Sequence, residues 1–259
     1  PFSIGKALAW TAMILFLALT IFPFLWVIRT AFSTTSSLAS NPGSLLPVDF
    51  ILGAFKRVLG LSTAAQSVAE GGSGASVNFW LYLRNSIIYS SAITVGQVFF
   101  STMAAYAFAR LRWPGRDLVF GLFLTALLVP PIFTSLPNFV LIKNLGLLNT
   151  FPGLVLPGFF MTPFAVFFMR QFFLGISREI EEAASIDGAG KWRTFFQIIV
   201  PLSSAPIATL SILTFIGSWN DYFWPLLVAG DDNVRVLTVA LGVFRSQTPQ
   251  GSPDWAGLM

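Results

Sequence analysis

Long apolar runs separated by shorter polar segments dominate the pattern of this 259-residue chain. A helix needs about 20 mostly apolar residues to cross the hydrocarbon core of a bilayer. Five runs reach that length, and their few charges lie near their ends, where a charge costs least. They are 7–28, about 86–108, about 118–140, about 154–173 and 201–219. The pattern therefore predicts an all-α membrane protein with five transmembrane helices, organised as one transmembrane domain over residues 1–259.

Prolines are concentrated in the last three of these runs. A proline removes a backbone hydrogen bond and bends its helix, although membrane helices tolerate single prolines well. The prolines concerned are Pro130, Pro131, Pro137, Pro157, Pro163 and Pro206. Their clustering predicts bent helices in the third, fourth and fifth spans.

Composition excludes several other classes of protein. The chain is 55% hydrophobic and 10% charged, with a mean hydropathy of +0.75. It has no cysteine and no histidine, so thiolate metal sites and the commonest general base are missing. The net charge of +4 is scattered and does not form a basic patch. We therefore expect no metal, no cofactor bound by this chain, no enzymatic activity and no nucleic-acid partner.

The basic residues suggest an orientation. Arg110, Arg112 and Arg116 crowd the short turn at 109–117, and positive charge favours the cytoplasmic side. With that turn inside, the N-terminus and the loop at about 174–200 are also cytoplasmic. The segments at about 30–83 and 221–259 then lie outside.

The loop at 174–200 carries a short acidic, alanine-rich segment between two apolar runs. Ser177 can cap a helix that begins at Arg178, with acidic residues near its positive end. Gly188 is a helix-stop signal because glycine tolerates a positive φ. A second amphipathic helix follows, with Trp192, Phe195, Phe196 and Ile199 on one face, and Pro201 then opens the fifth span. Such a loop is either a solvated connection or a docking surface for another protein.

The spacing inside this loop favours docking. It resembles the signature of the permease subunits of binding-protein-dependent ABC importers, which is Glu-Ala-Ala, three residues, Gly, nine residues and Ile-x-Leu-Pro. The matching residues are Glu182, Ala183, Ala184, Gly188, Ile198 and Pro201, with Val200 where leucine is usual. The resemblance implies the type I ABC importer permease bundle, with a sixth transmembrane helix expected after Met259.

In that family the loop is the coupling helix, seated in a cleft of an ATPase subunit. By resemblance, Glu182 meets a polar or basic partner there, and Ala183, Ala184 and Gly188 permit close packing. Asp187, Ile198 and Pro201 complete the predicted coupling residues.

A second group of residues follows the fifth run. Trp219, Asn220 and Tyr222 precede an aromatic residue and Pro225-Leu226. Such a group is commonly an aromatic belt at the membrane interface. Its order also resembles the carbohydrate-type, MalG-like permeases, and an amide beside an aromatic ring suits a sugar. These three residues are the predicted substrate path.

The resemblance implies a permease that moves a sugar or oligosaccharide across the cytoplasmic (inner) membrane by alternating access. The implied partners are an ATPase dimer that holds ATP and Mg²⁺, a second permease subunit, and an extracytoplasmic sugar-binding protein. The alternatives are the same machine for a phosphorylated polyol or a peptide, and an ion-coupled secondary transporter.

Two apparent motifs do not change this interpretation. The segment 188–192 has neither the spacer nor the Ser or Thr of a phosphate-binding loop, so we expect ATP hydrolysis on a separate chain. Asp231, Asp232 and Asn233 are three adjacent oxygen-bearing residues, which predicts a turn more readily than a calcium site.

Overall fold

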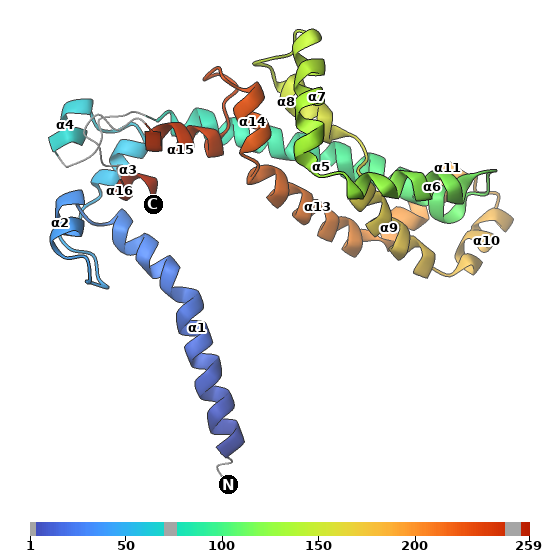
Figure 1. Ribbon diagram of the computed structural model, residues 1–259. Coiled ribbons are helices and arrows are strands. Elements are labelled where there is room, and N and C mark those ends of the chain that lie inside the picture. The colour runs from blue at the N-terminus through green and yellow to red at the C-terminus, as the bar shows by residue number, and fades with distance from the viewer. Residues whose placement is uncertain (1–3, 70–76, 247–254) are drawn as a thin grey trace. The chain divides into compact units, whose positions relative to one another are not determined.

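The computed structural model describes residues 4–69, 77–246 and 255–259, and within them every regular element is helical (Figure 1). This confirms the all-α prediction. Parts of both predicted outer segments, 70–76 and 247–254, lie outside the described residues. The chain divides into two compact units, residues 1–81 with 240–259 and residues 82–239, with boundaries near the start of α5 and within α15.

The first unit contains α1 (Ile4–Ala31), α2 (Thr35–Ser40), α3 (Gly53–Val58), α4 (Ala64–Ala69) and α16 (Trp255–Leu258). Helix α1 is an unbroken apolar helix of 28 residues, as the first run predicted. At its end the buried Arg29 side chain donates a 2.6 Å hydrogen bond to the carbonyl oxygen of Asn41. The same guanidinium lies 4.7 Å from the ring centroid of Trp26, so it joins the end of α1 to the end of α2.

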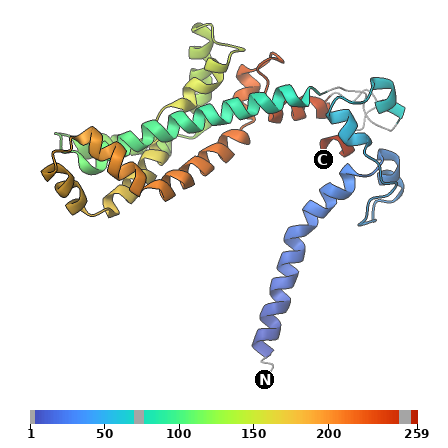
Figure 2. The same cartoon turned by 180° about the vertical axis from the view of Figure 1, so that it is seen from behind.

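The second unit is built along α5 (Phe79–Arg110), a helix of 32 residues. Its other helices are, in chain order, α6 (Arg116–Thr125), η1 (Ala126–Leu128), α7 (Pro131–Asn144), α8 (Phe151–Phe159), α9 (Pro163–Gly175), α10 (Arg178–Ile186), α11 (Lys191–Thr194), η2 (Phe195–Ile199), α12 (Val200–Leu202), α13 (Ser204–Trp219), α14 (Phe223–Val228) and the start of α15 (Leu237–Ser246). The core of this unit joins α5 to α6, α9, η2 and α13, with Ala105, Met169, Phe173, Ile199 and Leu210 almost fully buried. Figure 2 shows α10 and α11 near the end of α5 that carries Arg110.

The last three predicted spans are each bent pairs of helices. The bends are 98° between 116–128 and 131–144, 45° between 151–159 and 163–175, and 77° between 191–202 and 204–219. The described residues therefore contain two unbroken spanning helices, or five spans if each bent pair crosses once. The prediction of bent helices is confirmed for the third and fourth spans, where Pro131 and Pro163 each begin the second helix of a pair. Pro137, Pro157 and Pro206 lie within α7, α8 and α13, and the bend of the fifth pair comes before Pro206, at Ser203.

One local prediction is wrong. Pro201 was expected to open the fifth span, but it lies inside α12, and the bend follows it at Ser203. Residues 195–199 form one turn of π-helix directly before it. A proline at 201 cannot donate to the carbonyl oxygen four residues earlier, and the wider π register accommodates that lost bond without ending the helix.

Side chains of α5 support the break between α8 and α9. The amide of Gln97 donates to the Thr162 hydroxyl at 3.2 Å, and the backbone N–H of Thr162 donates to the Ser101 hydroxyl at 3.3 Å. A Cβ added to Gly96 would collide with the ring and carbonyl of Phe159, so glycine permits this close approach. Backbone polar groups exposed by a break inside a membrane need such partners.

Candidate functional site

The loop between α9 and α13 contains two short helices joined by a tight turn. The Ser177 hydroxyl accepts the backbone N–H of Glu179 at 3.3 Å, so Ser177 caps α10 as predicted. At the other end Gly188 has φ +76°, with backbone bonds from Gly188 to Ser185 (3.1 Å) and from Ala189 to Ala184 (2.9 Å). This paired pattern is the Schellman ending that favours glycine, and it confirms the predicted helix stop.

The turn presents most of the predicted coupling residues to the outside. Glu182, Ala183, Asp187 and Gly188 are exposed, whereas Ala184 is buried against the rest of the unit. Ile186 projects from the same turn with 86% of its surface exposed. A single exposed apolar side chain is common on protein surfaces, so Ile186 is of interest because it lies on the same turn as the predicted coupling residues. Sequence reasoning missed Ile186, although its position as an apolar residue inside a polar segment was a usable signal.

The second helix of the loop does not have the single apolar face that was predicted. Phe195 and Ile199 are buried in the core, but Trp192 and Phe196 are exposed and stack on one another with ring centroids 6.0 Å apart. The two pairs, each four residues apart, lie side by side on the helix surface, and only Phe195 and Ile199 face the core. Ile198 is half-buried, and Pro201 is exposed.

A buried ion pair joins this loop to the end of α5. Arg110 Nε and Glu181 Oε1 lie 3.1 Å apart, and their side chains are only 4% and 13% exposed. The two atoms are close but not aligned for a hydrogen bond, so the contact is an ion pair. Tyr106 Oη donates to the second carboxylate oxygen of Glu181 at 3.3 Å.

The same arginine also holds the end of α9. Its guanidinium donates to the carbonyl oxygens of Phe173 and Ile176 at the C-terminal end of α9, and the Phe173 oxygen also accepts the backbone N–H of Ile176 at 3.2 Å. Arg110 thus links α5, the end of α9 and the first helix of the loop. A displacement of α10 would act on α5 through this side chain.

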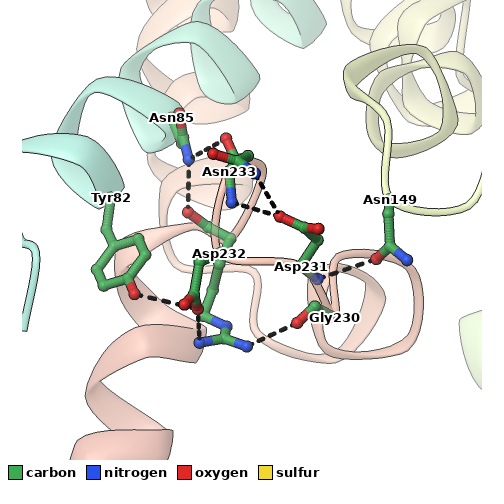
Figure 3. Close-up of polar contacts among 8 residues, drawn as sticks. Tyr82, Asn85, Asn149, Gly230, Asp231, Asp232 and Asn233 are labelled. Carbon is green, nitrogen blue, oxygen red and sulfur yellow. Dashed lines mark hydrogen bonds and ion pairs between the residues drawn. The ribbon is translucent and has the colours of Figure 1, made fainter.

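At the opposite end of α5, a polar cluster fixes the loop between α14 and α15 (Figure 3). The buried Asn85 amide donates to the carbonyl oxygens of Asn233 and Arg235, both at 2.9 Å. Tyr82 Oη donates to Asp232 Oδ1 at 3.2 Å, and the backbone N–H of Asp231 donates to Asn149 Oδ1 at 3.0 Å.

These contacts occupy one carboxylate oxygen of each aspartate of the segment. Asp232 is paired with Arg235, and Asp231 Oδ1 accepts both the backbone and the side-chain N–H groups of Asn233, at 2.8 and 2.9 Å. Among the described residues no cluster of three or more potential metal-binding side chains is found. The segment 231–233 is the turn that was predicted.

The predicted substrate residues lie at the junction of α13 and α14. Asn220 is the C-cap of α13, and its amide donates to the carbonyl oxygen of Ile216 at 2.8 Å. Trp219 is half-buried and stacks on Phe215 with centroids 5.7 Å apart, and Tyr222 is exposed.

A cavity of about 390 Å³ lies beside that junction, lined from α5, α7, α8 and α13 through α14. Its wall is formed by the neighbours of the predicted residues, Ser218, Asp221 and Trp224. Tyr89 of α5 closes one side, and its hydroxyl donates to Asp221 Oδ2 at 2.9 Å.

Comparison with known proteins gives a consistent result. Residues 97–258 match the family described as "Binding-protein-dependent transport system inner membrane component". The diacetylchitobiose uptake system permease protein NgcG of Streptomyces coelicolor is 33% identical over 241 residues, which are 93% of this chain and 74% of that protein. The sn-glycerol-3-phosphate transport system permease protein UgpE of Salmonella typhi is 33% identical over 249 residues, covering 96% of this chain and 85% of that protein.

A solved structure shows the same fold. It belongs to a bacterial ABC transporter involved in the import of the acidic polysaccharide alginate. The alignment covers 100% of this chain and 91% of that chain, with a TM-score of 0.81 and 23% identity.

Proposed function

Since this chain belongs to the family of binding-protein-dependent transport system inner membrane components, we propose that it is the permease subunit of an ABC importer that carries a sugar or oligosaccharide inward. The match confirms the family that the loop motif indicated. Its relatives are named as uptake and transport permeases, so this chain is a transport component. The name of NgcG supports a sugar substrate, and the aromatic and amide residues after α13 suit one.

The observation that carries the mechanism is the exposed turn at Glu182–Gly188 with a buried ion pair behind it. The turn docks in a cleft of an ATPase subunit, where Ile186 supplies apolar contact and Ala183 with Gly188 allow close approach. Glu182 meets a polar or basic group of the partner. Asp187 ends α10, while Ile198 and Pro201 direct the chain into α13.

Movement of the turn then passes into the membrane helices. Arg110, at the end of α5, contacts both Glu181 and the end of α9, so we expect a shift of α10 to act on these two helices. Alternating access follows if the ATPase holds the turn in two positions, because coupling requires contacts that differ between two states.

The remaining parts of the machine are inferred from this role. ATP and Mg²⁺ bind to the partner ATPase dimer, a second permease subunit completes the path, and an extracytoplasmic binding protein delivers the solute. The chain lies in the cytoplasmic (inner) membrane with a cytoplasmic N-terminus. The substrate path runs past the segment containing Trp219, Asn220 and Tyr222.

A second candidate substrate is a phosphorylated polyol, because the UgpE proteins are transport permeases for sn-glycerol 3-phosphate and are equally similar. Uptake by proteoliposomes containing the whole importer separates the two. We expect ATP-dependent accumulation of N,N′-diacetylchitobiose or another neutral sugar, and none without ATP. Accumulation driven by an ion gradient alone, with no need for ATP, would contradict the proposed machine.

A further inference from the structure

The cavity beside the α13–α14 junction lies at mid-depth of the second unit. Tyr89 and Gln97, which line it, flank the midpoint of the 32-residue helix α5. Many secondary transporters bind solute near the membrane midplane, where broken helices leave backbone and polar side chains facing a cavity. Here the wall from α7 begins directly at the 98° break, at Pro131.

Polar side chains of both hydrogen-bonding types line this cavity. The hydroxyls of Thr134 and Ser135 both donate to the carbonyl oxygen of Pro131 at 2.9 Å, which leaves their oxygen atoms as acceptors. Asn138, one turn further along α7, forms no side-chain hydrogen bond within the part of the chain that the structure describes, so its amide offers both donors and an acceptor.

An aromatic side chain from α14 also lines the cavity. Trp224 Nε1 donates to the carbonyl oxygen of Leu154 at 3.0 Å, which fixes the indole ring beside the cavity. Asp221 is held in place by Tyr89 Oη and by the backbone N–H of Trp224 at 3.4 Å. An ordered carboxylate, an unpaired amide and an aromatic ring suit the hydroxyls and the C–H face of a sugar ring.

The charge in this cavity decides between the two candidate solutes. Among the described residues that line it, Asp221 is the one formally charged side chain, and neither Lys nor Arg is present. A phosphate is recognised by Arg, Lys or clustered backbone N–H groups. An anion here would instead meet the like charge of the Asp221 carboxylate.

We infer that this cavity is a subsite of the permease for an uncharged, polyhydroxylated solute, with Asn138, Asp221 and Trp224 as its contacts. The inference rests on the proposed import function, and it excludes a phosphorylated polyol as the solute recognised here. At about 390 Å³ the cavity lies within the range of small-molecule sites and suits one end of an oligosaccharide.

The test uses the absence of cysteine from this chain. Asn138→Cys places one thiol in the cavity, and Asn144→Cys places one at the exposed end of the same helix as a control. The whole importer carrying each variant is treated with a small maleimide, and the labelling rate of this subunit is measured. The probes are N,N′-diacetylchitobiose, maltose and sn-glycerol 3-phosphate, added separately; Ser135→Cys replaces Asn138→Cys if that variant does not assemble.

We expect a neutral sugar to slow labelling at position 138 severalfold and to leave position 144 unchanged. Glycerol 3-phosphate should protect neither position. Protection at 138 by glycerol 3-phosphate alone, or by none of the probes, would overturn the subsite.

Measurements of sugar uptake distinguish a failure of the proposed subsite from a failure of the proposed import function. Asn138→Leu should lower ATP-driven sugar uptake by about three- to tenfold, the effect of one lost hydrogen bond, and Asn144→Leu should not. If both variants transport sugar equally well, the proposed import function is retained and the proposed subsite is refuted. If the unaltered importer accumulates no sugar at all, the proposed sugar import and the subsite both fail.

Discussion

The ion pair between Arg110 and Glu181 gives the sharpest test of how the loop is joined to the membrane helices. Both side chains are nearly excluded from solvent, so solvent screening reduces their interaction little. Breaking a buried pair by neutralising one member costs about 3–5 kcal/mol. Arg110 keeps its two carbonyl partners when Glu181 is changed, which places Glu181→Gln near the lower limit, at about 3 kcal/mol.

The assay compares Glu181→Gln with Glu179→Gln in the purified importer. Glu179 is an exposed acid in the same first turn of α10, so it controls for lost charge on that helix. We expect Glu181→Gln to lower the temperature of thermal unfolding and to raise the number of ATP molecules hydrolysed per solute transported. Glu179→Gln should change neither quantity strongly, since an exposed helix-end charge is worth about 0.3–1 kcal/mol.

A double-mutant cycle identifies the partner. Combining Glu181→Gln with Arg110→Met should cost clearly less than the sum of the two single changes, because contacting residues are coupled. Additive effects of the two changes would refute a coupling between Arg110 and Glu181, as would equal stability and ATP use of Glu181→Gln and Glu179→Gln.

Three further changes are predicted, each measured in the whole importer. Gly188→Val forces a β-branched residue into positive φ, at a cost of about 1–3 kcal/mol, and should abolish uptake while membrane insertion is retained; equal uptake by Gly188→Val and the unaltered protein would contradict this. Glu182→Lys reverses an exposed charge and should weaken co-purification of the ATPase without altering thermal unfolding of the permease. Asn85→Leu removes two hydrogen bonds to the loop after α14 and should make that loop more susceptible to limited proteolysis, by leaving carbonyl oxygens unpaired at about 1–3 kcal/mol each; an unchanged cleavage rate would count against it.

Features set by local sequence were predictable. Helix α1 follows from one charge-free run, and the ends of α10 follow from the serine cap and the positive-φ glycine. The bends in the third and fourth spans follow from Pro131 and Pro163, which stand directly after the breaks. In each case the residues that determine the structure lie within a few positions of one another.

Features that depend on packing were not predictable in the same way. Arg110 and Glu181 are far apart along the chain, and either charge could equally have faced water. The apolar face expected before Pro201 is divided into a buried pair, Phe195 and Ile199, and an exposed pair, Trp192 and Phe196. Whether a side chain on a helix is buried depends on which other helix packs against it. A single sequence does not contain that information.

The predicted substrate residues lie one or two positions away from the residues that line the cavity. The sequence directed attention to Trp219, Asn220 and Tyr222, whereas their neighbours Asp221 and Trp224 line the cavity. Helix α13 ends at Trp219, so successive residues here turn away from one another, and Asn220 uses its amide to cap the helix. The position of the motif predicts which segment lies beside the cavity. The course of the backbone determines which side chains of that segment line it.

The central claim is that the turn containing Ile186 faces the cytoplasm and is covered by an ATPase. An Ile186→Cys variant, made in a chain that has no other cysteine, tests it directly with a membrane-impermeant maleimide. The account predicts no labelling in intact cells, labelling in inside-out vesicles stripped of the ATPase, and protection when the ATPase is added back. Labelling from outside in intact cells would contradict it.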